Sequence, residues 1–188
     1  WSPDGRTIAF LRRTPDGGAL MTISPLGGGE RKLASGRFTF SSRPSWTPDS
    51  RWIVSHVAGG TRLGLIPATG GEPRQLTRPS AGQFDFIGTV SADGRTLAFL
   101  RLSSAIRGQL MTVALSEGYQ AQGEPRLVVG VRFVHALCWM PDGSGLVYSA
   151  QLGGQNDFGL FLLDLASPND QRRLAAFGDH ARDPAFAR

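Results

Sequence analysis

The chain has 188 residues, of which 40% are hydrophobic and 25 are glycine, a composition that suits one globular domain with many tight turns. Its 20 basic and 15 acidic side chains give a formal net charge of +5. No apolar run approaches the ~20 residues of a membrane-spanning helix, and the single cysteine, Cys138, cannot form a disulfide within the chain. These features exclude a helical membrane span and an internal disulfide from this segment.

One motif opens the chain and returns three times. It reads Trp-Ser-Pro-Asp-Gly-Arg at residues 1–6, runs into the β-forming residues Thr-Ile-Ala-Phe, and has later copies that begin at Trp46, Val90 and Trp139. The spacings between copies are 45, 44 and 49 residues. A period in this range, built from short strands, is typical of propeller blades. No window has apolar residues at i, i+3, i+4 and i+7, which excludes helical repeats of similar length.

Each copy of the motif predicts a tight turn. Proline presets φ, aspartate accepts hydrogen bonds from nearby backbone N–H groups, and glycine takes the positive φ that closes the turn. The second copy has Ser50 in place of glycine, and the third has Ala92 in place of proline. Equivalent positions in successive repeats are not expected to converge on one metal or acid–base site. We therefore interpret four aspartates as structural turn residues: Asp4, Asp49, Asp93 and Asp142.

The repeats are expected at about 1–45, 46–89, 90–138 and 139–185, with the start of a further repeat at 186. The expected strands, in chain order, are 7–13, 19–24, 31–34, 43–46, 52–57, 62–67, 74–77, 84–90, 96–102, 109–115, 126–129, 134–139, 145–150, 158–165 and 172–175. The predicted fold class is therefore all-β: a β-propeller segment of about four four-stranded antiparallel blades, within a larger propeller.

The two ends of the chain suggest a segment of a longer protein, since the first residue falls inside a repeat. The sequence Asp-Pro-Ala-Phe at residues 183–186 is similar to Arg-Pro-Ser-Trp at residues 43–46. Either blades are missing from this segment, or residues 183–186 close on the first blade. We favour missing blades.

Positive charge gathers on the last strand of each predicted blade. These residues are Arg31, Lys32, Arg74, Arg126, Arg172 and Arg173. The outermost strand of a blade is an exposed sheet edge, where charges discourage pairing with other chains. The excess positive charge is thus distributed over the outer edges of all the blades and does not form one continuous basic surface. We do not expect this segment to bind nucleic acid directly.

The sequence contains no recognisable catalytic motif. It lacks the Gly-x-Ser-x-Gly elbow of serine hydrolases, and also His-Glu-x-x-His, Cys-x-x-Cys, a phosphate loop and a dinucleotide fingerprint. Cys138 lies in an apolar run and is interpreted as a buried small hydrophobe rather than a reactive thiol. His56 lies in a predicted strand and is interpreted as structural. We expect no enzyme activity, no cofactor and no metal site.

The repeated Trp-Ser-Pro-Asp-Gly-Arg and Ile-Ala-Phe copies resemble the WD-repeat-like β-propeller repeats of the TolB type, over essentially the whole chain. Two further phrases, at residues 23–34 and 123–127, resemble the C-terminal propellers of bacterial signalling proteins. Such propellers follow a winged-helix DNA-binding domain of the CadC type or a Ser/Thr kinase domain. The resemblance is specific for the repeat and much less so for function.

Propellers usually bind ligands at the mouth of the central channel, and the connections between blades are predicted at residues 35–42, 78–83, 130–135 and 177–182. The candidate ligand-binding residues in or beside these connections are Arg37, Arg43, Arg132, His135, His180 and Arg182, interleaved with Phe38, Phe40 and Phe133. Arginines and aromatics that converge there would suit a partner protein or a small anionic ligand. The alternative is that they are ordinary loop charges and blade-packing aromatics.

The predicted function is that of a non-catalytic sensor or interaction domain in a bacterial transcriptional regulator or kinase. Two alternatives are a substrate-gating propeller of a prolyl-oligopeptidase-like peptidase and a TolB-like periplasmic envelope scaffold. The resemblance implies a periplasmic location if the segment belongs to a membrane-anchored regulator, and a cytoplasmic one otherwise. The residues that flank this segment in the whole protein discriminate between these settings.

Overall fold

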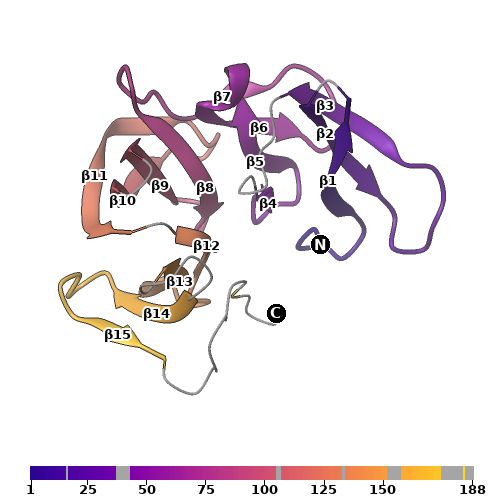
Figure 1. The fold of residues 1–188 in the computed structure, drawn as a ribbon. Helices are drawn as coiled ribbons and strands as arrows, with labels where there is room; N and C mark the ends of the chain where they lie inside the picture. The colour runs from indigo at the N-terminus through magenta and orange to yellow at the C-terminus, as the bar shows by residue number, and fades with distance from the viewer. Residues whose placement is uncertain are drawn as a thin grey trace.

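The structure is a computed structural model, and it describes residues 1–15, 17–36, 43–104, 107–132, 134–151, 158–174 and 184. These residues form four antiparallel sheets that follow one another in chain order (Figure 1). Apart from the short 3-10 helix η1 (Ala58–Gly60), all regular elements in this part of the chain are strands. The predicted all-β propeller with antiparallel blades is confirmed.

Each sheet is a meander in which neighbouring strands in sequence pair with one another. The first sheet contains β1 (Ile8–Thr14), β2 (Gly17–Ile23) and β3 (Arg31–Gly36). The second contains β4 (Ser45–Trp46), β5 (Trp52–Val57), β6 (Arg62–Pro67) and β7 (Arg74–Gln75). The third contains β8 (Phe84–Val90), β9 (Thr96–Ser104), β10 (Arg107–Leu115) and β11 (Ala121–Val131). The fourth contains β12 (Val134–Trp139), β13 (Gly145–Gln151), β14 (Phe158–Asp164) and β15 (Gln171–Arg173).

Three of the four sheets have the predicted four strands, and the first has three among the described residues. Its β1 follows a motif turn directly and so corresponds to β5, β9 and β13. The closure of residues 183–186 on this blade stays a prediction, because these residues, Pro184 excepted, lie outside the described part of the chain. The larger propeller likewise stays a prediction.

The third blade differs from its prediction at its outer strand. The expected strands 109–115 and 126–129 leave a connection over residues 116–125, but β11 already begins at Ala121 and pairs with β10 across two register shifts. Gly123 has φ 75°, and Pro125 has no N–H to donate. Both residues lie where the register shifts, so the expected loop is an irregularity inside a strand. The prediction of a long connection was wrong for this physical reason.

The sheets pack against one another through three apolar clusters, one for each pair of neighbouring blades. The first cluster joins β2 and β3 to β5 and β6 through Leu20, Leu33, Ile53 and Ile66. The second lies between the second and third sheets, and the third between the third and fourth sheets. Face-to-face packing of this kind explains why strands such as β9 are apolar on both faces.

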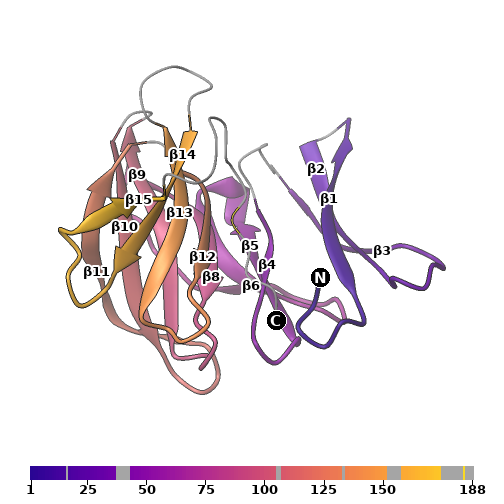
Figure 2. The ribbon, with the colours of Figure 1, turned by 90° about the horizontal axis from the view of Figure 1, so that it is seen from below.

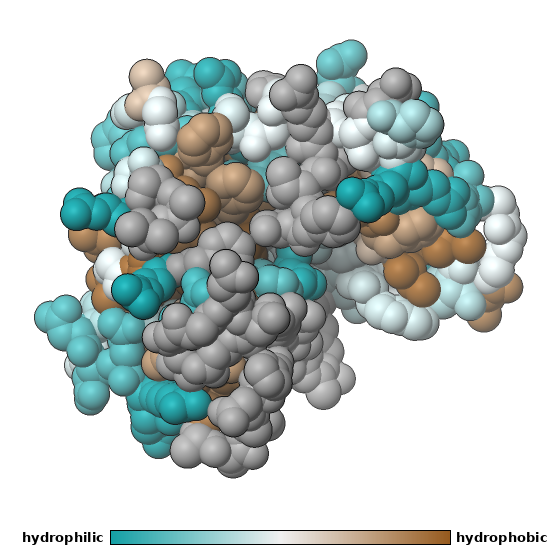
Figure 3. All heavy atoms as spheres, viewed as in Figure 1, coloured by the Kyte–Doolittle hydropathy of each residue, from teal (hydrophilic) through white to brown (hydrophobic). Residues whose placement is uncertain are grey.

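The order of strands sets which residues face the middle of the molecule. Figure 1 shows β4, β8 and β12 toward the middle and β3, β7, β11 and β15 toward the periphery, and Figure 2 shows the sheets side by side from below. The basic residues of the outer strands are exposed, except Arg74, which is half-buried with its guanidinium 4.9 Å from the ring centre of Trp52. Figure 3 shows hydrophobic surface over the first sheet, whose β1 is half-buried.

Among the described residues we find no helix with the length and apolar character that a transmembrane span requires.

Candidate functional site

The sequence places candidate ligand-binding residues on the connections between blades. Three of the six, Arg37, His180 and Arg182, lie outside the described residues, as do the interleaved aromatics Phe38, Phe40 and Phe133. The structure therefore places Arg43, Arg132 and His135, and it brings two of these three together.

Arg43 and His135 meet although 92 residues separate them in the chain. Arg43 lies two residues before β4, and His135 is the second residue of β12, so each stands at the start of an innermost strand. The Nε of Arg43 donates a hydrogen bond of 3.1 Å to the carbonyl oxygen of His135. The approach of the second and fourth blades at the middle of the molecule thus creates a contact that neither segment forms alone.

The Arg43 guanidinium also contacts the His135 ring. Its Nη2 lies 3.1 Å from Nδ1 and 3.2 Å from Nε2 of the imidazole, so it faces the ring as a whole. The His135 ring also makes an edge-on contact with the ring of Phe158, with ring centres 5.5 Å apart. Both Arg43 and His135 are half-buried. An arginine held in this way presents a permanent positive charge in a place that solvent screens less than the open surface.

His135 lies within β12, where the expected strand over residues 134–139 places it, and at the end of the connection expected over residues 130–135. Strand β11 continues to Val131 and β12 begins at Val134, which leaves a short connection. Arg132 lies in that connection and its side chain is exposed. The connection is shorter than the expected 130–135, because the strand pairing between β10 and β11 extends to Gly108 and Val131.

Each turn aspartate holds its own turn. The Oδ1 atoms of Asp4, Asp49, Asp93 and Asp142 each accept a hydrogen bond from the backbone N–H two residues later, at 2.9–3.1 Å. An i to i+3 backbone hydrogen bond closes each of the four turns at 2.9–3.0 Å. We define turns 1 to 4 by these bonds, as residues 2–5, 47–50, 91–94 and 140–143.

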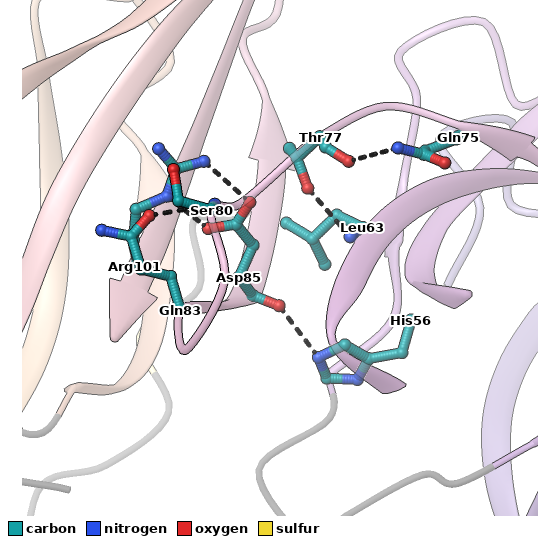
Figure 4. Close-up of polar contacts among 8 residues, drawn as sticks. All are labelled: His56, Leu63, Gln75, Thr77, Ser80, Gln83, Asp85 and Arg101. Carbon is teal, nitrogen blue, oxygen red and sulfur yellow. Dashed lines mark hydrogen bonds and ion pairs between the residues drawn. The ribbon is translucent and has the colours of Figure 1, made fainter. Parts of the chain in front are cut away.

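A second polar cluster, which the sequence did not predict, joins the second and third blades (Figure 4). The fully buried carboxylate of Asp85 accepts hydrogen bonds from Nε and Nη2 of Arg101 at 2.7 and 3.0 Å. The Nε2 of His56 lies 3.2 Å from the carbonyl oxygen of Asp85, which makes the ring nitrogen the donor. Burial lowers the pKa of His56, against the opposing effect of this hydrogen bond.

The Asp85–Arg101 pair carried a signal that could have been recognised. Asp85 is the only charged residue of β8 and Arg101 is the only charged residue of β9, and cross-strand register places them opposite one another. Since a buried charge needs a partner, two such residues in adjacent strands predict an ion pair. The pair is enclosed, so we interpret it as structural.

Two further observations bear on chemistry at these positions. Burial raises the pKa of the Cys138 thiol to about 11, which disfavours the nucleophilic thiolate. In the part of the chain that the structure describes, no three His, Cys, Asp or Glu side chains are grouped so that they could hold a metal ion.

The family profile of the lipoprotein LpqB β-propeller domain matches residues 1–137. The chain belongs to this family. Solved structures agree with the propeller fold: TolB from Acinetobacter baumannii superposes with a TM-score of 0.72 at 18% identity, over 89% of this chain and 40% of that one. Prolyl oligopeptidase B from Galerina marginata gives a TM-score of 0.59 at 18% identity, over 92% of this chain and 27% of that one. The expected TolB-like fold is confirmed.

Two curated relatives are similar in sequence. The protein named uncharacterized peptidase YuxL, from Bacillus subtilis (strain 168), is 29% identical over 163 residues, which are 84% of this chain and 22% of the relative. The protein named YidR, from Escherichia coli (strain K12), is 33% identical over 101 residues, or 53% of this chain and 24% of the relative. This member of the family thus spans about a quarter of the length of the curated relatives that it matches.

Proposed function

We propose that this chain is a non-catalytic binding domain that takes an anionic ligand, or an acidic segment of a partner protein, where its innermost strands meet. The observation that carries the proposal is the contact of Arg43 with His135 at the start of β4 and β12. Two blades that are distant in sequence supply one guanidinium and one imidazole there. The absence of hydrolase, metal and nucleotide motifs from the sequence supports a binding role.

The chemistry of this contact favours an anion. A guanidinium offers N–H donors in a planar fork that matches carboxylate and phosphate groups. The bond from Nε of Arg43 to the His135 carbonyl restrains its rotation, so less conformational entropy is lost when a ligand binds. The half-buried position of both residues strengthens the attraction of an anion compared with an exposed arginine.

Titration calorimetry with inorganic phosphate and with a hexaglutamate peptide tests the proposal. Loss of one charge-assisted hydrogen bond corresponds to about a tenfold loss of affinity or more, which is the effect expected for Arg43→Gln. The matched control is Arg126→Gln, which removes the same charge from the exposed outer strand β11. Equal losses in the two variants would mean diffuse electrostatic attraction, and would overturn the proposed site.

In the whole protein, we propose that this domain is the sensory or interaction part of a bacterial signalling protein, joined to a winged-helix or kinase domain. The support is the similarity of residues 23–34 and 123–127 to propellers in such proteins. Sequencing of the complete open reading frame tests the setting. The expected result is an N-terminal winged-helix or kinase domain. A reading frame without either domain would contradict the sensor proposal.

A second candidate is the gating propeller of a peptidase. It is favoured by the 29% identity to the relative named as a peptidase, over 84% of this chain. This candidate predicts a C-terminal α/β-hydrolase domain with a Gly-x-Ser-x-Gly elbow in the complete reading frame. A third candidate, an envelope scaffold, is favoured by the description of the family as a lipoprotein propeller domain and predicts a cleavable N-terminal signal.

A further inference from the structure

Consecutive motif turns lie beside one another at one end of the sheets, and the space between each pair is filled differently. Between turns 1 and 2 the space is closed by direct contact. Ser50 stands where turns 3 and 4 have glycine, with φ 60°, and its Oγ accepts a hydrogen bond of 3.1 Å from the backbone N–H of Asp4. This hydrogen bond joins the first pair of turns directly.

Between turns 2 and 3 the space is filled by the phenol of Tyr119, which is 7% exposed. A methyl group built on Gly94 of turn 3 would lie 3.4 Å from Cε1 and 3.6 Å from the hydroxyl of Tyr119. On the turn 2 side, the phenol interacts with Asp49 and Thr47. Burial and then the negative charge of Asp49 raise the pKa of Tyr119.

Tyr119 reaches this position from the connection between β10 and β11. Its N–H donates to the carbonyl oxygen of Ser116 at 2.9 Å, and its own φ is 56°, a left-handed conformation that is uncommon for a tyrosine. The guanidinium of Arg74 in the second blade donates to the carbonyl oxygen of Gly118. A strained backbone held by the neighbouring blade indicates that the phenol is specifically accommodated between the turns.

Between turns 3 and 4 the same space is a cavity of about 330 Å³. This volume is at the lower end of the ~300–1,000 Å³ of small-molecule sites. Its lining includes Ser91, Asp93, Trp139, Asp142, Gly143 and Leu165. By position in the repeat, Ser91 and Asp93 correspond to Thr47 and Asp49, and Gly143 corresponds to Gly94. The cavity therefore presents the groups that surround Tyr119 one blade earlier.

Among the described residues that line the cavity, the connection after β14 supplies no aromatic side chain. This equivalent connection of the fourth blade runs from Leu165 to Asp170 and contains no aromatic residue. The connection forms a local hydrogen bond, in which the N–H of Ala166 donates to Oδ1 of Asp164 at 2.8 Å. Leu165 lines the cavity without filling it.

We propose that the cavity between turns 3 and 4 binds a phenolic ring, as carried by a tyrosine side chain, with its hydroxyl toward Ser91 and Asp93 and its ring between Gly143 and Trp139. The hydrogen bonds that hold the two turn carboxylates use Oδ1 of Asp93 and Oδ1 of Asp142. A carboxylate oxygen has further lone pairs with which to accept a phenol. The indole of Trp139 offers an aromatic neighbour for the ring.

The two aspartates could instead attract an amine or a guanidinium. The repeat argues for the phenol, because turns 2 and 3 also carry two aspartates, Asp49 and Asp93, and the group between them is Tyr119. The proposal is independent of the anion site at Arg43, which lies at the innermost strands rather than at the motif turns.

Amide NMR titration of the full chain tests the proposal with four probes: p-cresol, N-acetyl-tyrosinamide, N-acetyl-phenylalaninamide and N-acetyl-lysinamide. We expect saturable shifts at Asp93 and Gly143, with the tyrosine amide bound about tenfold more tightly than the phenylalanine amide, the scale of one hydrogen bond to a charged acceptor. The comparison of two probes shows where the phenolic ring comes from. If the site accepts tyrosine side chains, the tyrosine amide binds at least as tightly as p-cresol. If it accepts free phenols, p-cresol binds more tightly. Tighter binding of the lysine amide, or equal binding of the phenylalanine amide, would overturn the proposal.

Two matched glycine variants check the location. Gly143 and Gly5 are equivalent, with φ 73° and 71°, and a methyl group on either meets nothing within 4 Å. Asparagine tolerates this conformation, so both variants should fold, as checked by circular dichroism. Gly143→Asn should block the cavity and abolish the shifts, while Gly5→Asn should bind as the wild type does. Unchanged binding by Gly143→Asn would place the ligand elsewhere.

A third variant tests the comparison with Tyr119. Tyr119→Ala removes the phenol from between turns 2 and 3, so p-cresol should raise its melting temperature by more than it raises that of the wild type. The absence of any added effect in this variant would remove the template on which the proposal rests.

Discussion

The carboxylate of Asp85 and the guanidinium of Arg101 face one another across β8 and β9, with Nε and Oδ1 2.7 Å apart. The acidic side chain is fully buried and the Arg101 side chain is 11% exposed. Because the carbonyl oxygen of the same aspartate is bonded to His56 of the second blade, the ion pair also anchors the contact between the blades (Figure 4).

We predict that Asp85→Ala lowers the free energy of unfolding by about 3–5 kcal/mol, since it leaves a buried guanidinium without its partner. Urea denaturation followed by circular dichroism measures the loss. The double variant Asp85→Leu with Arg101→Met, which removes both charges, should lose clearly less than Asp85→Ala. A loss below about 1 kcal/mol for the single variant would show that the pair contributes no more than a surface ion pair.

The second prediction concerns pH and His56. Burial holds its pKa below the ordinary value of 6.5, so the unfolded chain binds a proton more readily than the folded chain does. Stability therefore rises with pH up to about 6.5 and falls below it, by at most about 1.4 kcal/mol per pH unit for one group. Denaturation midpoints measured from about pH 5 to pH 7 should show this slope in the wild type.

The control is His56→Gln, which keeps an N–H donor for the Asp85 carbonyl and does not titrate. Its slope over the same range should be flatter than that of the wild type. Identical slopes would assign the pH dependence to other groups.

The third prediction uses two tryptophans at equivalent motif positions. The indole N–H of Trp139 donates to the carbonyl oxygen of Thr89 at 3.0 Å. The indole N–H of Trp46 is buried and finds no acceptor among the described residues. Trp139→Phe should therefore destabilise the chain by about 1 kcal/mol more than Trp46→Phe, which is the net value of one hydrogen bond. Thermal unfolding of both variants measures the difference, and a larger loss for Trp46→Phe would contradict it.

The fourth prediction concerns the close approach of strands at Gly145. A methyl group at this position would overlap the carbonyl oxygen of Leu163 in the paired strand β14. Gly145→Ala should therefore lower the free energy of unfolding by about 1–3 kcal/mol. Gly130→Ala is the matched control in β11, where a methyl group meets nothing within 4 Å. Chemical denaturation of the pair checks the prediction, which fails if the two variants are equally stable.

Local patterns in the sequence determined the blades of this protein. The period of 45, 44 and 49 residues and the Asp-turn motif predict where each strand pair begins, because turn chemistry acts within a few residues. The structure accordingly has antiparallel sheets at those positions, and the carboxylate oxygens of Asp4 and Asp93 accept the turn N–H groups. The sequence did not predict the irregularity in β11. Gly123 and Pro125 are typical of a loop, and only the pairing with β10 shows that they lie within a strand.

Only the tertiary structure decided which residues meet. The residues next to Arg43 in the sequence do not indicate that its guanidinium contacts His135, 92 residues later. That contact depends on how the second and fourth blades approach one another. The same holds for Tyr119 between turns 2 and 3 and for the cavity one blade later. Turns form from local torsion preferences, whereas sites in a propeller form where blades pack, so the sequence determined the blades and the packing determined the sites.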